Sequence, residues 1–115
     1  MTQLVLDKRT ADSRRYDILC APLLLNGAMI ASISSITADQ GGMTLGSGVI
    51  NNAPLSYEDG STAATGTVIQ VSISGGTVPT GLPLLMCTIR AVFVTTAGET
   101  LEATVQLRLV NTPGI

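Results

Sequence analysis

Three segments in the last third of the chain alternate between apolar and polar residues: VIQVSIS at 68–74, LMCTIRAVFVT at 85–95 and LEATVQLRL at 101–109. In the last segment the odd positions are apolar and the even positions are polar or charged. This alternation is typical of β-strands with one face in a core and the other in water. The turn sequences GGTVPTG at 75–81 and AGE at 97–99 separate the segments. Together they predict three consecutive strands and an all-β fold.

The remainder of the chain predicts four shorter strands, interrupted by polar and glycine-containing turns. These strands are expected at 4–6, 14–18, 29–37 and 43–49, with a polar loop at 7–13. Turn signals recurring roughly every 8–12 residues are typical of an antiparallel β-sandwich. The sequence therefore predicts a single domain over residues 1–115, an antiparallel sandwich of about seven strands. An extended N-terminal arm over residues 1–13 is an open alternative for the first segment.

Two local features leave alternatives open. Residues 21–27, APLLLNG, predict either a tight apolar turn or a single helical turn. Asn26 and Gly27 are expected to end it, because both residue types tolerate a positive φ. In 29–37 the alternation slips, which indicates either a β-bulge or burial on both faces.

Composition narrows the classes of partner. Only 12% of the 115 residues are charged and 45% are hydrophobic, so disorder is not expected. A net charge of −2 and 3% aromatic residues argue against nucleic-acid binding. No apolar run approaches the roughly 20 residues that cross a bilayer, and no secretory signal is recognisable at the N-terminus. We therefore expect no membrane partner and synthesis without export.

The core is expected to consist of aliphatic side chains, since the chain has no Trp and only one Phe. Such a core predicts a weakly stable monomer that gains stability from burial against partners. Cys87 is expected on an inward face with Ile89 and Phe93. A disulfide between Cys20 and Cys87 is disfavoured, because free buried cysteine is common and no export to an oxidising compartment is indicated.

The residue types needed for catalysis are missing. The sequence has no histidine, which removes the most frequent general base and most zinc sites. Gly75 and Gly76 lack the Lys-Ser/Thr ending of a phosphate-binding loop, so they predict a turn. Asp39 and Asp59 match no calcium-loop spacing. We expect no catalytic residues, no metal and no cofactor.

Two polar or irregular regions are candidate contact surfaces, residues 4–15 and the loop 51–66. Tyr57 is expected to anchor the loop against the body. The candidate contact residues are Leu4, Val5, Leu6, Lys8, Arg9, Arg14, Arg15, Tyr57, Glu58 and Asp59. The basic residues among them could contact an acidic partner. The favoured interpretation is that they are surface charges beside their own acids, where each ion pair contributes only about 0–1 kcal/mol.

Three segments, in order, resemble small proteins encoded among tailed-phage structural genes. They are KRTADSRRYD at 8–17, LNGAMIASISSITA at 25–38, and 71–109, which contains VSISGGTVPTG and TTAGETLEATVQLRL. The chain departs from that family at Leu19 and Cys20, where the relatives often carry Asp and Trp. The resemblance implies an immunoglobulin-like sandwich in a non-enzymatic virion protein of the fibre-tail adaptor or minor virion type.

The resemblance further implies synthesis in the cytoplasm of a bacterial host and a final location in the virion. The expected partners are tail, fibre, neck or capsid subunits, together with further copies of the chain. An adaptor at the tail or fibre attachment is the first hypothesis, and a capsid decoration or cement protein is the second. A host-surface or carbohydrate-binding module is disfavoured, because Tyr16 and Tyr57 are the only tyrosines and no Trp offers a platform for a sugar ring.

Overall fold

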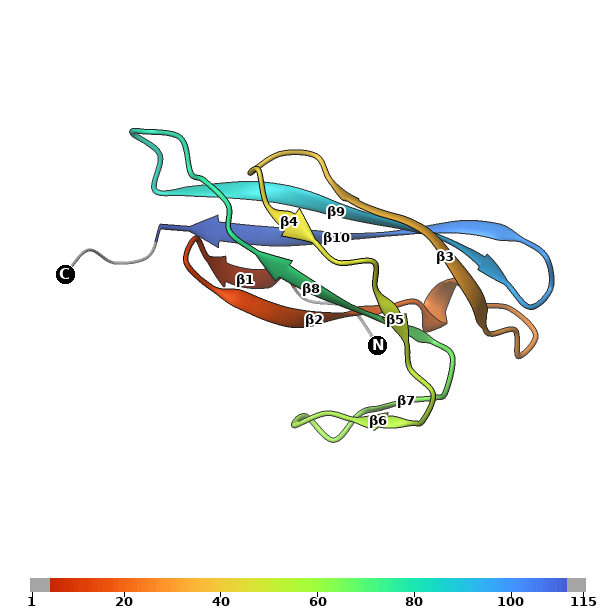
Figure 1. The fold of residues 1–115 in the computed structure, drawn as a ribbon. Helices are drawn as coiled ribbons and strands as arrows, with labels where there is room; N and C mark the ends of the chain where they lie inside the picture. The colour runs from red at the N-terminus through yellow and green to blue at the C-terminus, as the bar shows by residue number, and fades with distance from the viewer. Residues whose placement is uncertain (1–4, 112–115) are drawn as a thin grey trace.

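The computed structural model describes residues 5–111. Within this range the chain forms ten strands and one short 3₁₀ turn, so the predicted all-β class is confirmed (Figure 1). The elements are β1 (Leu6–Arg9), β2 (Ser13–Leu19), η1 (Ala21–Leu23), β3 (Ile30–Ala38), β4 (Thr44–Leu45), β5 (Val49–Ile50), β6 (Leu55–Ser56), β7 (Thr62–Ala63), β8 (Val68–Ser74), β9 (Leu84–Thr95) and β10 (Thr100–Val110).

Two sheets form the body of the molecule. The first has the order β1-β10-β9-β3, and the second has the order β2-β8-β4 with β5 also paired to β8. All of these pairs are antiparallel except β1 with β10, which is parallel. The strands β6 and β7 pair only with each other and form a hairpin that stands away from the two sheets (Figure 1).

The inward faces of the two sheets share one core. Every second residue of β9 from Cys87 to Phe93 is fully buried, and these side chains belong to the same cluster as the inward residues of β8 and β10. This cluster contains Tyr16, Ile18, Cys20, Ile30, Ile69, Val71, Ile73, Val78, Cys87, Ile89, Ala91, Phe93, Ala103, Val105, Leu107 and Leu109. The alternation in the three C-terminal segments therefore predicted correctly which side chains face the core. Cys20 and Cys87 are both buried and both free.

The first strand lies further along the chain than predicted. Leu6–Arg9 is β1, so residues 7–9 belong to the first sheet and not to a polar loop or a free arm. The backbone of β1 pairs in parallel with β10 on one side, from Leu6 opposite Leu107 to Arg9 opposite Val110. The sequence pattern does not indicate this strand, because residues 7–9 are charged. A short edge strand needs few apolar residues, since backbone hydrogen bonds hold it to its neighbour.

The open local alternatives are resolved by the backbone. Residues 21–23 form a single 3₁₀ turn, and the chain reverses at Asn26 and Gly27, whose φ values are +56° and +73°. In β3 the register against β9 shifts twice, between Ile30 and Ser32 and between Ile33 and Ser35, so the slip in the sequence pattern marks bulges.

The fourth predicted strand is divided at Gly46–Gly48 into β4 and β5. A Cβ atom on Gly48 would lie 2.6 Å from Ile36 Cδ1, so a side chain here would force Ile36 to shift, and the φ of +83° also favours glycine. The hairpin β6–β7 was not predicted; the sequence indicated only a loop over 51–66. No helix long and apolar enough to cross a membrane occurs between residues 5 and 111.

Candidate partner-contact site

An open pocket of about 680 Å³ lies where β1 ends and β2 begins, and we call it the end pocket. Its lining residues are Asp7, Lys8, Arg9, Asp12, Ser13, Arg14, Leu84, Arg108 and Val110. Four of the six basic residues of the chain line it, against two of the eight acidic ones. The end pocket is therefore net positive although the whole chain carries a charge of −2.

Lys8 supplies a buried positive charge to this end of the molecule. Its side chain lies on the same face of β1 as Leu6 and is only 1% exposed. The ammonium donates hydrogen bonds to the carbonyl oxygens of Gly75 at 2.6 Å and Arg9 at 2.8 Å. Burial lowers the pKa of Lys8, partly offset by the nearby carboxylate of Asp12. The expectation that the Lys8 side chain lies at the surface is therefore wrong: Lys8 joins β1 to the loop after β8.

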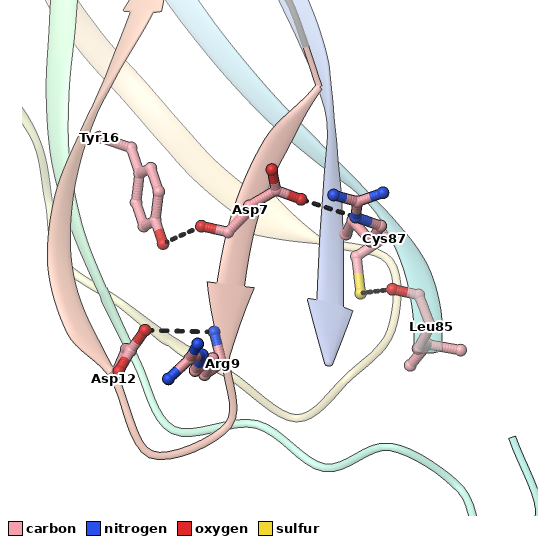
Figure 2. Close-up of polar contacts among 7 residues, drawn as sticks. Asp7, Arg9, Asp12, Tyr16, Leu85 and Cys87 are labelled. Carbon is pink, nitrogen blue, oxygen red and sulfur yellow. Dashed lines mark hydrogen bonds and ion pairs between the residues drawn. The ribbon is translucent and has the colours of Figure 1, made fainter. Parts of the chain in front are cut away.

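Both acidic side chains that line the end pocket, Asp7 and Asp12, already accept hydrogen bonds. Asp7 Oδ1 accepts a hydrogen bond from Arg108 Nε at 2.7 Å, and the Asp7 carbonyl accepts one from the Tyr16 hydroxyl at 2.8 Å (Figure 2). Asp12 Oδ2 accepts the backbone N–H of Arg9 at 3.3 Å and closes the turn between β1 and β2. Burial raises the pKa of Tyr16 above its ordinary value.

The second candidate region, 51–66, is held at its base by Asn51. This residue is 4% exposed, and both the nitrogen and the oxygen of its side-chain amide form hydrogen bonds. Its Nδ2 donates to the carbonyls of Ala53 and Ala64 at 3.0 and 2.9 Å. Its Oδ1 accepts the backbone N–H groups of Thr67 and Val68, both at 3.0 Å. The side chain thus joins the two ends of the segment that carries β6 and β7.

The outer end of this segment, Tyr57–Gly60, forms a closed turn that we call the hairpin tip. The Gly60 N–H donates to the Tyr57 carbonyl at 3.0 Å, and Asp59 Oδ1 accepts the Ser61 N–H at 2.9 Å and hydroxyl at 2.6 Å. The Ser61 hydrogen bonds lower the pKa of Asp59, which keeps it ionised. The Tyr57 hydroxyl donates to Asp17 Oδ2 on β2 at 3.0 Å, so Tyr57 anchors the hairpin as predicted.

The structure divides the predicted contact residues between these two places. Lys8, Arg9 and Arg14 line the end pocket, whereas Tyr57, Glu58 and Asp59 form the hairpin tip. Arg15 is exposed but is not part of the pocket lining.

The first residues of the predicted contact region differ in how far they are exposed. Val5 is 50% exposed, Leu6 packs against the core, and Leu4 lies outside the described residues.

Sequence reasoning missed Asp7, Asp12 and Arg108 as pocket residues, and it treated Asn51 only as a turn former. The approach of Arg108 to Asp7 depends on strand pairing across almost the whole chain, which no local pattern encodes. Between residues 5 and 111, no cluster of three or more His, Cys, Asp or Glu side chains is placed to hold a metal ion. Comparison with protein-family models and with curated proteins finds no match to the chain.

Proposed function

We propose that this protein is a non-enzymatic structural component of a bacteriophage particle, an adaptor that joins tail or fibre components through protein–protein contacts. The observation that carries the proposal is the combination of a two-sheet β body with two separate contact surfaces, the end pocket and the hairpin tip. Each surface is held by hydrogen bonds to the body, as in the Lys8 and Tyr57 contacts. Preformed surfaces of this kind reduce the ordering cost of binding.

The strand orders favour an immunoglobulin-like version of the sandwich. An immunoglobulin constant-type domain has sheets with strands A-B-E-D and C-F-G. The orders β2-β8-β4 and β3-β9-β10 correspond to B-E-D and C-F-G. The strand β1 adds to the free side of β10, as a first strand shared between the two sheets would. This correspondence supports the resemblance of segments 8–17, 25–38 and 71–109 to tailed-phage virion proteins.

The environment of the two tyrosines favours an adaptor over a carbohydrate-binding module. Tyr16 is 8% exposed, and the hydroxyl of the half-buried Tyr57 is engaged with Asp17. A sugar-binding platform needs an aromatic face open to solvent. Neither ring therefore offers the surface on which that function depends.

Imaging of particles from phage that lack the gene tests the proposal. An adaptor predicts complete heads with tails that lack fibres or distal parts, and addition of the purified protein restores attachment. Stable, fully fibred particles would overturn the adaptor function. Heads that rupture while the tails stay complete would also overturn it, in favour of a decoration protein.

A further inference from the structure

The end pocket and the hairpin tip carry opposite charges. The end pocket is lined by four basic and two acidic side chains. The hairpin tip carries Glu58 and Asp59, both exposed, and no basic residue. Complementary charge of this kind directs how two surfaces meet and which partners are rejected.

The end pocket contains arginine side chains that belong to neither ion pair found between residues 5 and 111. Within residues 5–111 the ion pairs are Arg90 with Glu102 and Arg108 with Asp7. Arg9 and Arg14 are exposed at the pocket and take part in neither pair. A guanidinium presents a planar fork of donors that matches the two oxygens of a carboxylate. Two such groups beside the buried charge of Lys8 have the chemistry to bind a carboxylate.

The hairpin tip is held in one conformation by hydrogen bonds, and it carries a carboxylate that can be bound. Asp59 is occupied by Ser61, and Tyr57 fixes the turn to β2, so Glu58 is the carboxylate left to project from the tip. Because the turn is already closed in the free chain, docking it costs little conformational entropy.

We propose that the hairpin tip of one copy docks into the end pocket of a second copy, with the Glu58 carboxylate held by Arg9 and Arg14. This proposal deepens the proposed function by naming a partner and a contact. The role of the contact in a particle rests on that proposed function. The two surfaces differ, so copies either exchange the contact twice in a dimer or pass it from copy to copy in a ring or an open filament. Exposed ion pairs are individually weak, so the contact is weak between free copies and gains strength when many copies are held together.

Sedimentation of the full chain with complementary charge reversals tests the contact. At low ionic strength, Glu58→Arg and Arg14→Glu should each weaken self-association about tenfold or more, and the equimolar mixture of the two variants should restore it to within about threefold. The matched control is Glu99→Arg, which makes the same charge change at the tip of the β9–β10 hairpin, where Glu99 is also exposed. It should leave association unchanged. Raising the salt concentration should weaken the wild-type association, because exposed charges are screened.

A second readout detects the contact even when it is weak and transient, because a disulfide traps each encounter. A mixture of Glu58→Cys and Arg14→Cys should form an intermolecular disulfide faster than a mixture of Glu99→Cys and Arg14→Cys, and the melting temperatures show that each variant is folded. Equal crosslinking of the two mixtures, or no rescue by the charge-reversed mixture, overturns the proposal. If Arg14→Glu abolishes incorporation into particles without affecting self-association, the pocket binds an acidic segment of another virion protein. That result overturns the contact between copies and leaves the adaptor function standing.

Discussion

The Tyr57 hydroxyl donates a hydrogen bond to Asp17 Oδ2 at 3.0 Å, and this contact joins the β6–β7 hairpin to β2 across 40 residues of sequence. Asp17 also accepts Gln70 Nε2 at 3.3 Å, so the acceptor is itself fixed by β8. The hairpin is therefore not a free loop, although it pairs with neither sheet. Its orientation depends on this side-chain contact and on Asn51.

Replacing Tyr57 with Phe should loosen the hairpin without disturbing the sandwich. The change removes one hydrogen bond to a carboxylate and keeps the ring, so we expect a loss of about 1.5 kcal/mol. Hydrogen exchange should show faster exchange at the Tyr57 and Gly60 amides, while the amides of β9 and β10 exchange as in wild type. Unchanged exchange in the hairpin would show that the hydroxyl contact does not hold it.

Ionisation of Tyr57 should destabilise the fold at alkaline pH. Burial, with the Asp17 hydrogen bond and charge, raises the pKa of Tyr57 to about 12, from an ordinary value of 10.0. The folded chain keeps this proton after the unfolded chain has lost it, so its contribution is complete below pH 10 and is lost as pH rises toward 12. Denaturant unfolding at a series of pH values should show a steeper alkaline fall for wild type than for Tyr57→Phe. Parallel curves would contradict the shift.

Asn51 should be one of the most sensitive polar positions in the chain. In Asn51→Ala the buried Val68 N–H and the Thr67 N–H lose their side-chain acceptor, and two carbonyls lose their donor. We expect a loss of about 2–4 kcal/mol from groups left without partners. Asn52 is exposed and serves as the matched control, with an expected change within about 0.5 kcal/mol for Asn52→Ala. Equal effects at the two positions, measured by urea unfolding, would exclude the bracing role of Asn51.

Lys8 should contribute through both its ammonium and its aliphatic stem. Lys8→Ala removes two charge-assisted hydrogen bonds and the buried stem, so we expect a loss of about 2–3 kcal/mol. Lys8→Met restores the stem but not the donors, and it should recover about half of that loss. Arg15→Ala, at an exposed position, is the control and should change stability little. A Lys8→Ala variant as stable as wild type would show that neither the two hydrogen bonds nor the buried stem contributes net stability.

The two neighbouring glycines after β8 should differ in their tolerance of a side chain. Gly76 has a φ of +118°, and its Cβ would lie 2.9 Å from Met43 Cγ. Gly75 has a φ of +68°, with nothing within 4 Å of its Cβ position. We expect Gly76→Ala to cost about 2–4 kcal/mol and Gly75→Ala about 1 kcal/mol in thermal or urea unfolding. The reverse order would contradict the packing of this loop on Leu109 and Met43.

The candidate site was only partly predictable. Tyr57 was recognised as an anchor because an aromatic residue inside a polar loop has few other ways to be stabilised. Its acceptor was not recognised, because an aspartate on a neighbouring strand carries no local signal. The basic residues at 8–15 were identified as a group, but their separation into a buried Lys8, an exposed Arg15 and two pocket residues depends on which strand each side chain leaves and on what lies opposite.

The amino-acid sequence alone determined the β class, the inward faces of β8, β9 and β10, and the turns at Asn26–Gly27 and Gly98. These properties are local: alternation sorts side chains onto two faces, and positive φ values select glycine and asparagine wherever they occur. Only the tertiary structure decided that β1 pairs in parallel with β10, that Asp7 meets Arg108, and that Lys8 is buried against Gly75. Each of these contacts joins residues more than sixty positions apart, so no local pattern encodes it. The first two form when β1 pairs with β10 in the first sheet, and the third forms when β1 meets the loop after β8.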